Sequence, residues 1–272
     1  SHFVSWGPNL EGATGAAALQ GYGDGTPVIT GYAIMDPIAG LFGASAVMTA
    51  ITHWRNTGKG QKIEVAQHEA GLQYVGEHIL GAADGQPLEQ TRGNHHAFAA
   101  PHGIFPCRGE DEWVVIACFD NKQWCGLSEA IGHPELATDS RFSSRLLRHR
   151  NQQLLAPVIS CWSKEFDKHE IARILQDHGV PAAPVNKAND LNADPHLKQR
   201  GFFQPLTLPD VGTHQYPGLP FKFSKSTPHV SAPSPSFAEH NRQVLVDMLG
   251  LSEEEYAHLE REGVVADAPR AR

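Results

Sequence analysis

Apolar residues with helical spacing between Pro37 and Trp54 form the longest regular segment of the chain. They fall on more than one face of a helix, which predicts a helix that is buried on several sides. Asp36 directly precedes the segment, and Asp followed by Pro is a typical N-cap and first helical residue. Gly58 lies just beyond the last apolar position and predicts the end of the helix. The pattern therefore predicts a helix over 37–54 that Asp36 caps.

A change of periodicity after this helix predicts a strand, a second helix and then a hairpin. Apolar and polar residues alternate over 61–66 and predict a short strand, whereas residues 67–80 have the spacing of a helix. The segment 81–101 is rich in Gly, Pro and polar residues, which is typical of a linker. Apolar runs at 102–107 and 112–118 are separated by a polar turn, so we expect two hairpin strands there.

The remainder of the chain is predicted to contain short helices and extended segments. The last helix begins at Ser252, which forms a capping-box pattern with Glu255 three residues later. Helices are expected near 121–131, 149–164, 167–178, 194–200, 239–248 and 252–262, and extended segments at 179–185 and 201–236. The order of the predicted strands and helices indicates an α/β fold.

Composition narrows the class of protein. The 272 residues suffice for a sizeable core or two domains, and a content of 40% hydrophobic and 19% charged residues is typical of a soluble globular protein. The net charge of −8 and the lack of a Lys/Arg-rich run argue against a nucleic-acid partner. No stretch comes near the ~20 apolar residues of a membrane-spanning helix, and no secretory signal is visible. We therefore expect a cytoplasmic protein without a membrane partner.

Cysteine and histidine spacing indicates neither a disulfide framework nor a metal site. Four cysteines lack C-x-x-C pairing and are expected to be buried thiols, namely Cys107, Cys118, Cys125 and Cys161. Among the 16 histidines, His68 is followed by Glu69 but lacks the second histidine of an H-E-x-x-H motif. We therefore expect no bound metal.

Asp36 has two interpretations from its local sequence. The simpler one is a helix cap. The other is catalytic, because a carboxylate that a helix N-terminus keeps ionised is a competent nucleophile toward an activated acyl group. Both can hold at once. The polar loop from Arg92 to His96 similarly fits either a cover over a binding site or a solvated linker.

Several segments together resemble the class III CoA-transferase family, to which carnitine and bile-acid CoA-transferases belong. The resemblance begins at Pro27–Gly40, continues in order and covers nearly the whole chain. The later landmarks are Thr57–Gln61, Ile63–Val65, Arg92–Asn94, Ala100–Ile104, Gly179–Val185, Asp194–His196, His240–Leu245 and Leu249–Ser252.

The resemblance implies an α/β class III CoA-transferase fold, with an incomplete Rossmann-like large domain, a small α/β domain and an interlocked dimer when complete. The chain resembles the C-terminal two-thirds of the family's usual length. We therefore expect an N-terminal half, either in the same protein or as a separate chain. The expected parts are the latter part of the large domain at 1–80, a linker at 81–101, the small domain at 102–200, a return linker at 201–237 and C-terminal helices on the large domain at 238–272.

The resemblance also implies an activity and its residues. Asp36 is expected to be the covalent nucleophile that moves CoA from an acyl-CoA to a small carboxylic acid, through anhydride and aspartyl-CoA thioester intermediates. Some members carry a glycine-rich segment after the Arg92 position, where this chain has Asn94, His95 and His96, and these three are expected to contact substrate. Coenzyme A and acyl-CoA are expected as substrates, with unassigned binding residues and no tightly bound cofactor.

Two alternatives remain open at this point. A 2-methylacyl-CoA racemase of the same superfamily would exchange an α-proton, but the racemase aspartate usually precedes a run of glycines that Asp36 lacks. The chain could instead be a non-catalytic subunit or fragment of a heteromeric CoA-transferase.

Overall fold

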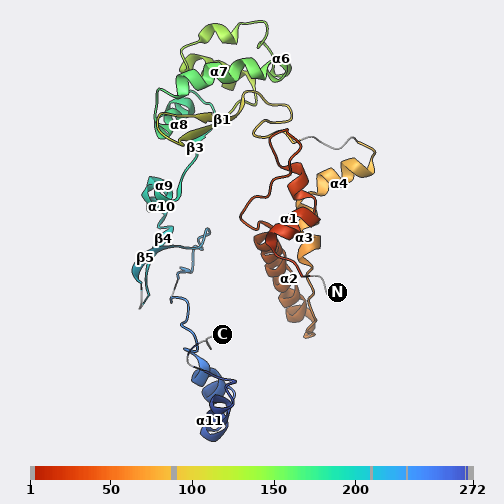
Figure 1. Ribbon diagram of the computed structural model, residues 1–272, viewed down its shortest axis with the longest axis vertical. Helices are drawn as coiled ribbons and strands as arrows, with labels where there is room; N and C mark the ends of the chain where they lie inside the picture. Colours follow the sequence, from red (N-terminus) through yellow and green to blue (C-terminus); the bar gives the residue numbers. More distant parts are fainter. Residues whose placement is uncertain (1–3, 87–90, 209–210, 231, 267, 269–272) are drawn as a thin grey trace. The chain divides into compact units, whose positions relative to one another are not determined.

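The chain forms two compact units, Ser1–Val185 and Asn186–Arg272. The computed structural model in Figure 1 describes residues 4–86, 91–208, 211–230, 232–266 and 268. Each unit combines helices with one small antiparallel sheet, so the chain has the mixed α/β character that its sequence predicts.

The first part of unit 1 is a group of helices. A small apolar core contains Leu10 of α1 (Gly7–Ala13), Met35 of α2 (Met35–Thr57) and Val75, which follows α3 (Gln67–Tyr74). Gly71 of α3 permits this packing, because a Cβ there would lie 2.7 Å from the sulfur of Met35. The elements are α1 (Gly7–Ala13), a 3-10 helix (Ala16–Leu19), α2 (Met35–Thr57), α3 (Gln67–Tyr74) and α4 (Gly76–Ala83).

Helix α2 begins earlier than its sequence predicts. Ile34 is the N-cap, so the prediction that Asp36 caps the helix is wrong, and Asp36 is the second helical residue. The reason is the turn before the helix, where Ala33 has a φ of 47° and its carbonyl accepts a hydrogen bond of 2.9 Å from the Asp36 amide. The predicted end is confirmed, since Gly58 ends α2 with a left-handed φ of 70°.

The apolar surface of α2 is mostly exposed, which contradicts the prediction of a helix buried on several sides. Met35 is its one buried residue, whereas Leu41 is 71% and Met48 61% exposed. By length and composition alone α2 is also able to cross a membrane, which corrects the expectation that no stretch comes near this limit. One such helix is weak evidence for a membrane protein, because helices of soluble proteins pass the same test.

Two further predictions in this region fail. Residues 61–66 form no strand, and they are exposed and lack a ladder partner among the described residues. A strand needs a neighbour for its backbone hydrogen bonds, so the alternating pattern alone does not produce one. The predicted helix over 67–80 is divided at Val75 into α3 and α4.

The second part of unit 1 is built on the predicted hairpin. Strands β1 (His102–Pro106) and β2 (Trp113–Ala117) pair antiparallel with His102 opposite Ala117, and β3 (Ala182–Pro184) adds to the other edge of β2. The linker that precedes β1 enters the sheet through a cis peptide bond between Ala100 and Pro101.

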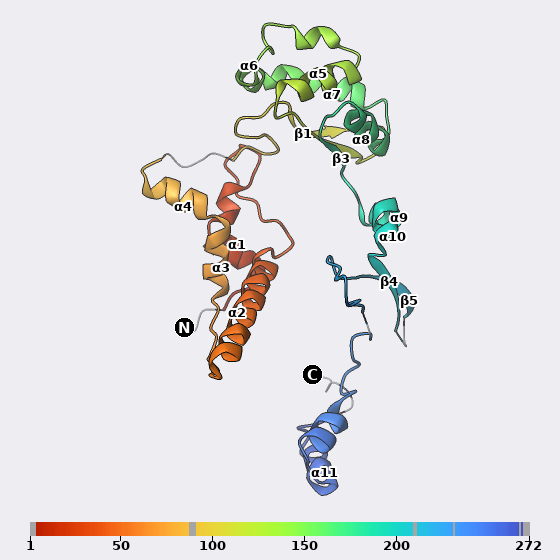
Figure 2. The ribbon, with the colours of Figure 1, turned by 180° about the vertical axis from the view of Figure 1, so that it is seen from behind.

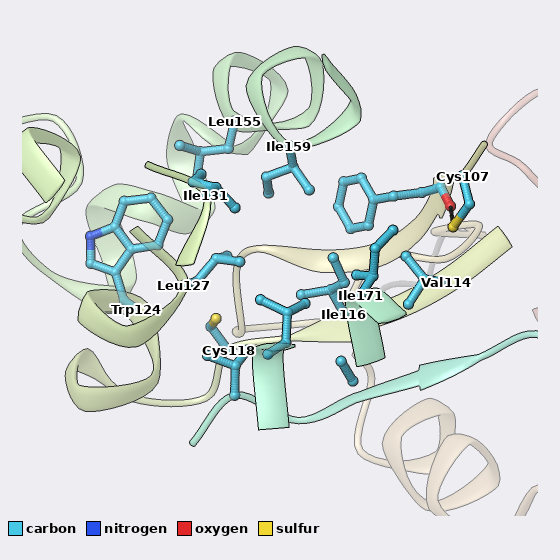
Figure 3. Packing of buried hydrophobic residues seen from close by; sticks show 14 of the residues in the cluster. Cys107, Val114, Ile116, Cys118, Trp124, Leu127, Ile131, Leu155, Ile159 and Ile171 are labelled. Atoms are coloured by element: carbon cyan, nitrogen blue, oxygen red, sulfur yellow. Dashed lines mark hydrogen bonds between the residues drawn. The ribbon is translucent and has the colours of Figure 1, made fainter. Parts of the chain in front are cut away.

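Helices cover this sheet and close the main hydrophobic core. Figures 1 and 2, which view the chain from opposite sides, both show α7 (Gln152–Ser163) and α8 (Lys168–Asp177) beside the sheet. Figure 3 shows Leu155 and Ile159 of α7 facing the strands, with Ile116 of β2 fully buried beneath them. The helices are α5 (Asn121–Ala130), α6 (Arg145–Arg150), α7 (Gln152–Ser163) and α8 (Lys168–Asp177), with a 3-10 turn at Pro134–Ala137. The helices predicted at 121–131, 149–164 and 167–178 are confirmed apart from their bounds. The sequence did not predict α6 as a separate helix, and Asn151 separates it from α7.

The four cysteines divide into two kinds. Cys107 and Cys118 are buried, as expected, but Cys125 and Cys161 are exposed, so the prediction of four buried thiols is half wrong. Cys125 lies in α5, where the neighbouring Trp124 faces the core and turns the next side chain outward.

Unit 2 contains a hairpin and short helices. The capping box is confirmed, because Ser252 Oγ accepts a hydrogen bond from the Glu255 amide at 3.2 Å and Glu255 Oε2 accepts one from the Ser252 amide at 2.8 Å. The elements are α9 (Ala188–Ala193), which the sequence did not predict, α10 (Pro195–Arg200), β4 (Phe203–Leu208), β5 (Gly212–Pro217), a π-helix (Gln243–Met248) and α11 (Glu253–Arg261).

Candidate functional site

Asp36 lies exposed in the first turn of α2, where the helix dipole favours a negative charge. The side-chain amide of Gln67, the first residue of α3, donates a hydrogen bond to Asp36 Oδ1. The other oxygen, Oδ2, faces Gly7 of α1, since a Cβ on Gly7 would lie 2.9 Å from it. One carboxylate oxygen is therefore held by Gln67, and the other lies beside a residue without a side chain.

A buried carboxylate holds the turn before α2, which runs from Thr30 to Ile34. Glu11 of α1 is fully buried, and its two oxygens accept hydrogen bonds of 2.8 Å from the Thr30 amide and the Thr30 hydroxyl. The Ile34 amide donates a third, longer bond of 3.4 Å. Burial, the largest single effect, raises the pKa of Glu11, but the hydrogen bonds from Thr30 and Ile34 together outweigh it and lower the pKa below its ordinary value. The three hydrogen bonds therefore favour the ionised form of Glu11.

The loop before β1 carries the other predicted site residues. The carbonyl of Asn94 accepts a hydrogen bond of 2.8 Å from His102 Nδ1, and the His95 amide donates one of 3.1 Å to the carbonyl of Arg92. Asn94 and His95 line a cavity of about 230 Å³, together with Arg92, His102 and other residues. This cavity is large enough for a small organic acid.

His96 has a different environment from its two neighbours. Its ring packs edge-on against Phe98 at 4.3 Å and Phe119 at 5.5 Å, and its carbonyl accepts a bond of 3.1 Å from His149. Burial, with smaller contributions from nearby cationic groups led by His102, lowers the pKa of His96. The Phe98 amide donates a hydrogen bond to Nδ1 of His96. Because an accepting ring nitrogen carries no proton, this bond fits a neutral ring. His96 therefore contributes to the packing of the loop and is not among the residues that line the cavity.

A second loop is attached to this one. The amide of Gly93 donates to the carbonyl of Gly21 at 2.8 Å, and the amide of Gly23 donates to Thr91 Oγ1 at 3.0 Å. Tyr22, between the two glycines, lines the cavity. The cavity is thus built from segments about 70 residues apart in the chain.

The predicted nucleophile and the predicted substrate-binding loop are not in direct contact in the part of the chain that the structure describes. Among the residues it describes, no hydrogen bond, ion pair or ring contact links Asp36 to Asn94, His95 or His96. The described part of the chain also contains no group of three or more His, Cys, Asp or Glu side chains placed to hold a metal ion.

Sequence reasoning did not identify Glu11, Gln67 or Gly7 as neighbours of the Asp36 region. No local pattern distinguishes Gln67, which lies 31 residues after Asp36. A weak signal exists for Glu11, because an acid within an otherwise apolar and small-residue segment is unusual unless it has partners.

Comparisons with known proteins identify the family. The profile of CoA-transferase family III matches residues 1–241. Succinyl-CoA--D-citramalate CoA-transferase of Chloroflexus aurantiacus is 28% identical over 255 residues, which cover 94% of this chain and 63% of that protein. The beta subunit of succinyl-CoA--L-malate CoA-transferase from the same organism is 29% identical, covering 92% of this chain and 62% of that protein.

A solved structure supports the same conclusion. The crystal structure of a CaiB/BaiF family protein from Brucella suis is similar with a TM-score of 0.79 at 27% identity, over 90% of this chain and 63% of that one. The chain thus spans a little under two thirds of the length of these relatives. Its fold is the class III CoA-transferase fold that the sequence motifs indicated, and the chain belongs to CoA-transferase family III.

Proposed function

We propose that the full-length protein transfers CoA from an acyl-CoA to a carboxylic acid and uses Asp36 as its covalent nucleophile. The observation that carries this proposal is the exposed Asp36 carboxylate at the start of α2, held through one oxygen by Gln67, in a chain of this family. A carboxylate attacks an activated acyl group directly, so the reaction needs no general base to create the nucleophile.

The proposed reaction proceeds through four acyl transfers. An Asp36 oxygen attacks the thioester carbonyl, the C–S bond breaks, and CoA thiolate leaves from a mixed anhydride. The thiolate then attacks the Asp36 carbonyl, which forms an aspartyl-CoA thioester and releases the donor acid as a carboxylate. The acceptor carboxylate attacks this thioester and displaces the thiolate, giving a second anhydride. Attack of the thiolate on the acceptor carbonyl forms the new acyl-CoA and restores Asp36.

Chemical trapping tests the nucleophile. The full-length protein is incubated with succinyl-CoA, quenched with hydroxylamine or borohydride and analysed by peptide mass spectrometry. Transfer activity is measured separately, with D-citramalate and L-malate as the first acceptors. These probes follow the names of the two similar Chloroflexus proteins. We expect modification at Asp36 and no activity in Asp36→Ala, whereas Asp84→Asn, which changes an exposed aspartate after α4, should retain activity. An active Asp36→Ala enzyme would contradict the proposal, and deuterium exchange at the α-carbon without an acceptor would favour a racemase.

The cavity beside Asn94 and His95 supports a substrate-binding role for this loop. Asn94 and His95 carry side chains that hydrogen-bond to carboxylates, and Arg92, a cation, is also among the residues that line the cavity. We expect Asn94→Ala and His95→Ala to raise the KM for the acid with a smaller change in kcat. His96→Ala should instead lower the stability of the loop, because the His96 ring packs on Phe98 and Phe119.

We also propose that the full-length enzyme is an interlocked dimer or contains a complementary chain. The exposed apolar side chains of α2, including Leu41, Met48 and Trp54, support a covering partner. Native mass spectrometry of the purified enzyme tests this proposal. A stable, active monomer with these side chains accessible to solvent would contradict it.

A further inference from the structure

Two residues of α1 support the turn before Asp36. Gly7 and Glu11 are four residues apart and therefore lie on the same face of the helix. Glu11 accepts hydrogen bonds from Thr30 and Ile34, at both ends of the turn. A Cβ on Gly7 would lie 2.2 Å from the Cβ of Ala33, so the helix contacts the turn directly at this point.

The turn has a conformation that its own sequence does not favour. Gly31 has a φ of 77°, which glycine adopts freely, but Ala33 has a φ of 47°. The left-handed conformation is unfavourable for alanine because of its Cβ, so the turn needs support from the rest of the structure. Ala33 is three residues before Asp36, and its carbonyl accepts the hydrogen bond from the Asp36 amide.

Glu11 is suited to this support because it is a carboxylate. Its two oxygens accept from three donors, the Thr30 amide, the Thr30 hydroxyl and the Ile34 amide. In the described part of the chain, its hydrogen-bond partners are these three groups, with no cation among them. A glutamine would offer one acceptor oxygen and would turn an NH2 group toward the remaining donors. Burial of a carboxylate without a cation beside it is costly. A residue that served only to fill space at this position would therefore not be a glutamate.

We propose that Glu11 is a positioning residue for catalysis. By holding Thr30 and Ile34, it sets the direction in which α2 begins and thereby the place of the Asp36 carboxylate relative to the thioester. The proposal rests on the proposed function of Asp36 as nucleophile. It predicts that a loss of this hydrogen-bond set slows the chemical step more than it weakens substrate binding.

The test measures the rate of Asp36 acylation in the full-length enzyme. Succinyl-CoA is mixed with excess enzyme, the reaction is trapped with hydroxylamine at timed intervals, and modified Asp36 is quantified by mass spectrometry. We expect Glu11→Gln to slow acylation about tenfold to a hundredfold, with the KM for succinyl-CoA changed about twofold or less. Glu69→Gln changes an exposed glutamate on α3 and should acylate at the wild-type rate.

Thr30 provides a second, milder pair of variants in case Glu11→Gln folds poorly. Thr30→Val removes the hydroxyl donor to Glu11, whereas Thr30→Ser retains it. We expect slower acylation in Thr30→Val and a nearly normal rate in Thr30→Ser, with similar melting temperatures for the two.

The outcomes separate this inference from the proposed function. If wild-type enzyme is not modified at Asp36, the proposed nucleophile fails. If the wild type is modified but Glu11→Gln and Thr30→Val acylate at the wild-type rate, the positioning role of Glu11 is overturned. A lower melting temperature with an unchanged acylation rate would likewise assign Glu11 a purely structural role.

Discussion

The side-chain amide of Gln67 donates a hydrogen bond to Oδ1 of Asp36, across 31 residues of sequence. The contact exists because α3 packs against the start of α2, where Gly71 makes room for the buried Met35. Packing of two helices therefore orients a carboxylate that is otherwise exposed to solvent.

Substitution of Gln67 should lower activity without unfolding the protein. Gln67→Ala removes a hydrogen bond to a charged group, so we expect kcat to fall about tenfold. Gln67→Glu should be more damaging, because a second carboxylate beside Asp36 repels its negative charge. Steady-state kinetics of the full-length enzyme measure both effects. Gln73→Ala changes an exposed glutamine on the same helix and serves as the control, and equal losses in Gln67→Ala and Gln73→Ala would contradict the prediction.

Two glycines of α1 should respond in opposite ways to alanine. A Cβ on Gly7 would lie 2.2 Å from the Cβ of Ala33 and 2.9 Å from Asp36 Oδ2, so Gly7→Ala must displace the turn and the carboxylate. A Cβ on Gly12 would meet no atom within 4 Å in the described part of the chain, apart from the backbone of its own helix. Gly12→Ala should therefore raise helix stability by up to about 1 kcal/mol. Thermal unfolding and kinetics of both variants test this contrast. A fully active and stable Gly7→Ala enzyme would show that the turn shifts freely.

Arg148 should contribute strongly to the stability of the second part of unit 1. Its buried guanidinium donates to the carbonyls of Ala100 and Phe142 at 3.1 Å each and lies over the ring of Trp124. Arg148→Leu leaves these carbonyls without their donor, and we expect a loss of about 3 kcal/mol in the free energy of unfolding.

Chemical denaturation provides the measurement for Arg148. Arg150→Leu, at an exposed position of the same helix, should change the free energy of unfolding by less than about 0.5 kcal/mol. Similar effects of the two substitutions would refute the role of Arg148.

The four thiols should differ in reactivity. Burial raises the pKa of Cys107 to about 11 and that of Cys118 to about 12, so neither forms a thiolate readily in the folded protein. Cys125 and Cys161 are exposed and should react first with a disulfide reagent near neutral pH. Peptide mapping after brief labelling identifies the modified residues. Early labelling of Cys118 would contradict the buried position that the structure assigns to it.

The same pKa values predict a loss of stability in alkali. The folded state retains the protons of Cys107 and Cys118 to a higher pH than the unfolded chain, in which a thiol has an ordinary pKa of 9.0. Their contribution is therefore fully present below pH 9 and is lost as the pH rises toward the folded values. Cys118→Ala should show a shallower alkaline decline in the free energy of unfolding than the wild type.

Some predictions that depend on neighbouring residues in the sequence agree with the structure. Ser252 and Glu255 are three residues apart and form the expected capping box. The hairpin of β1 and β2 follows from two apolar runs joined by a short turn. Motifs spread over nearly the whole chain also led to the correct family, because together they are far more specific than any one of them alone.

Predictions that depend on distant residues fail or lack detail. The start of α2 is two residues earlier than the Asp-Pro pattern predicts, since Glu11 and Gly7 shape the preceding turn. The alternating segment 61–66 is no strand, because nothing in the described chain pairs with it. The division of Asn94, His95 and His96 between a cavity and an aromatic cluster likewise depends on residues from other elements.

The sequence by itself determined the family, the hairpin, most helices and the identity of Asp36 as the acid to test. These features depend on motifs and periodicities within short segments of chain. Only the tertiary structure decided which oxygen of Asp36 is held, by Gln67, and which residue, Glu11, holds the turn before it. Hydrogen bonds between residues 19 and 31 positions apart arise from helix packing, and no local pattern in the chain encodes them.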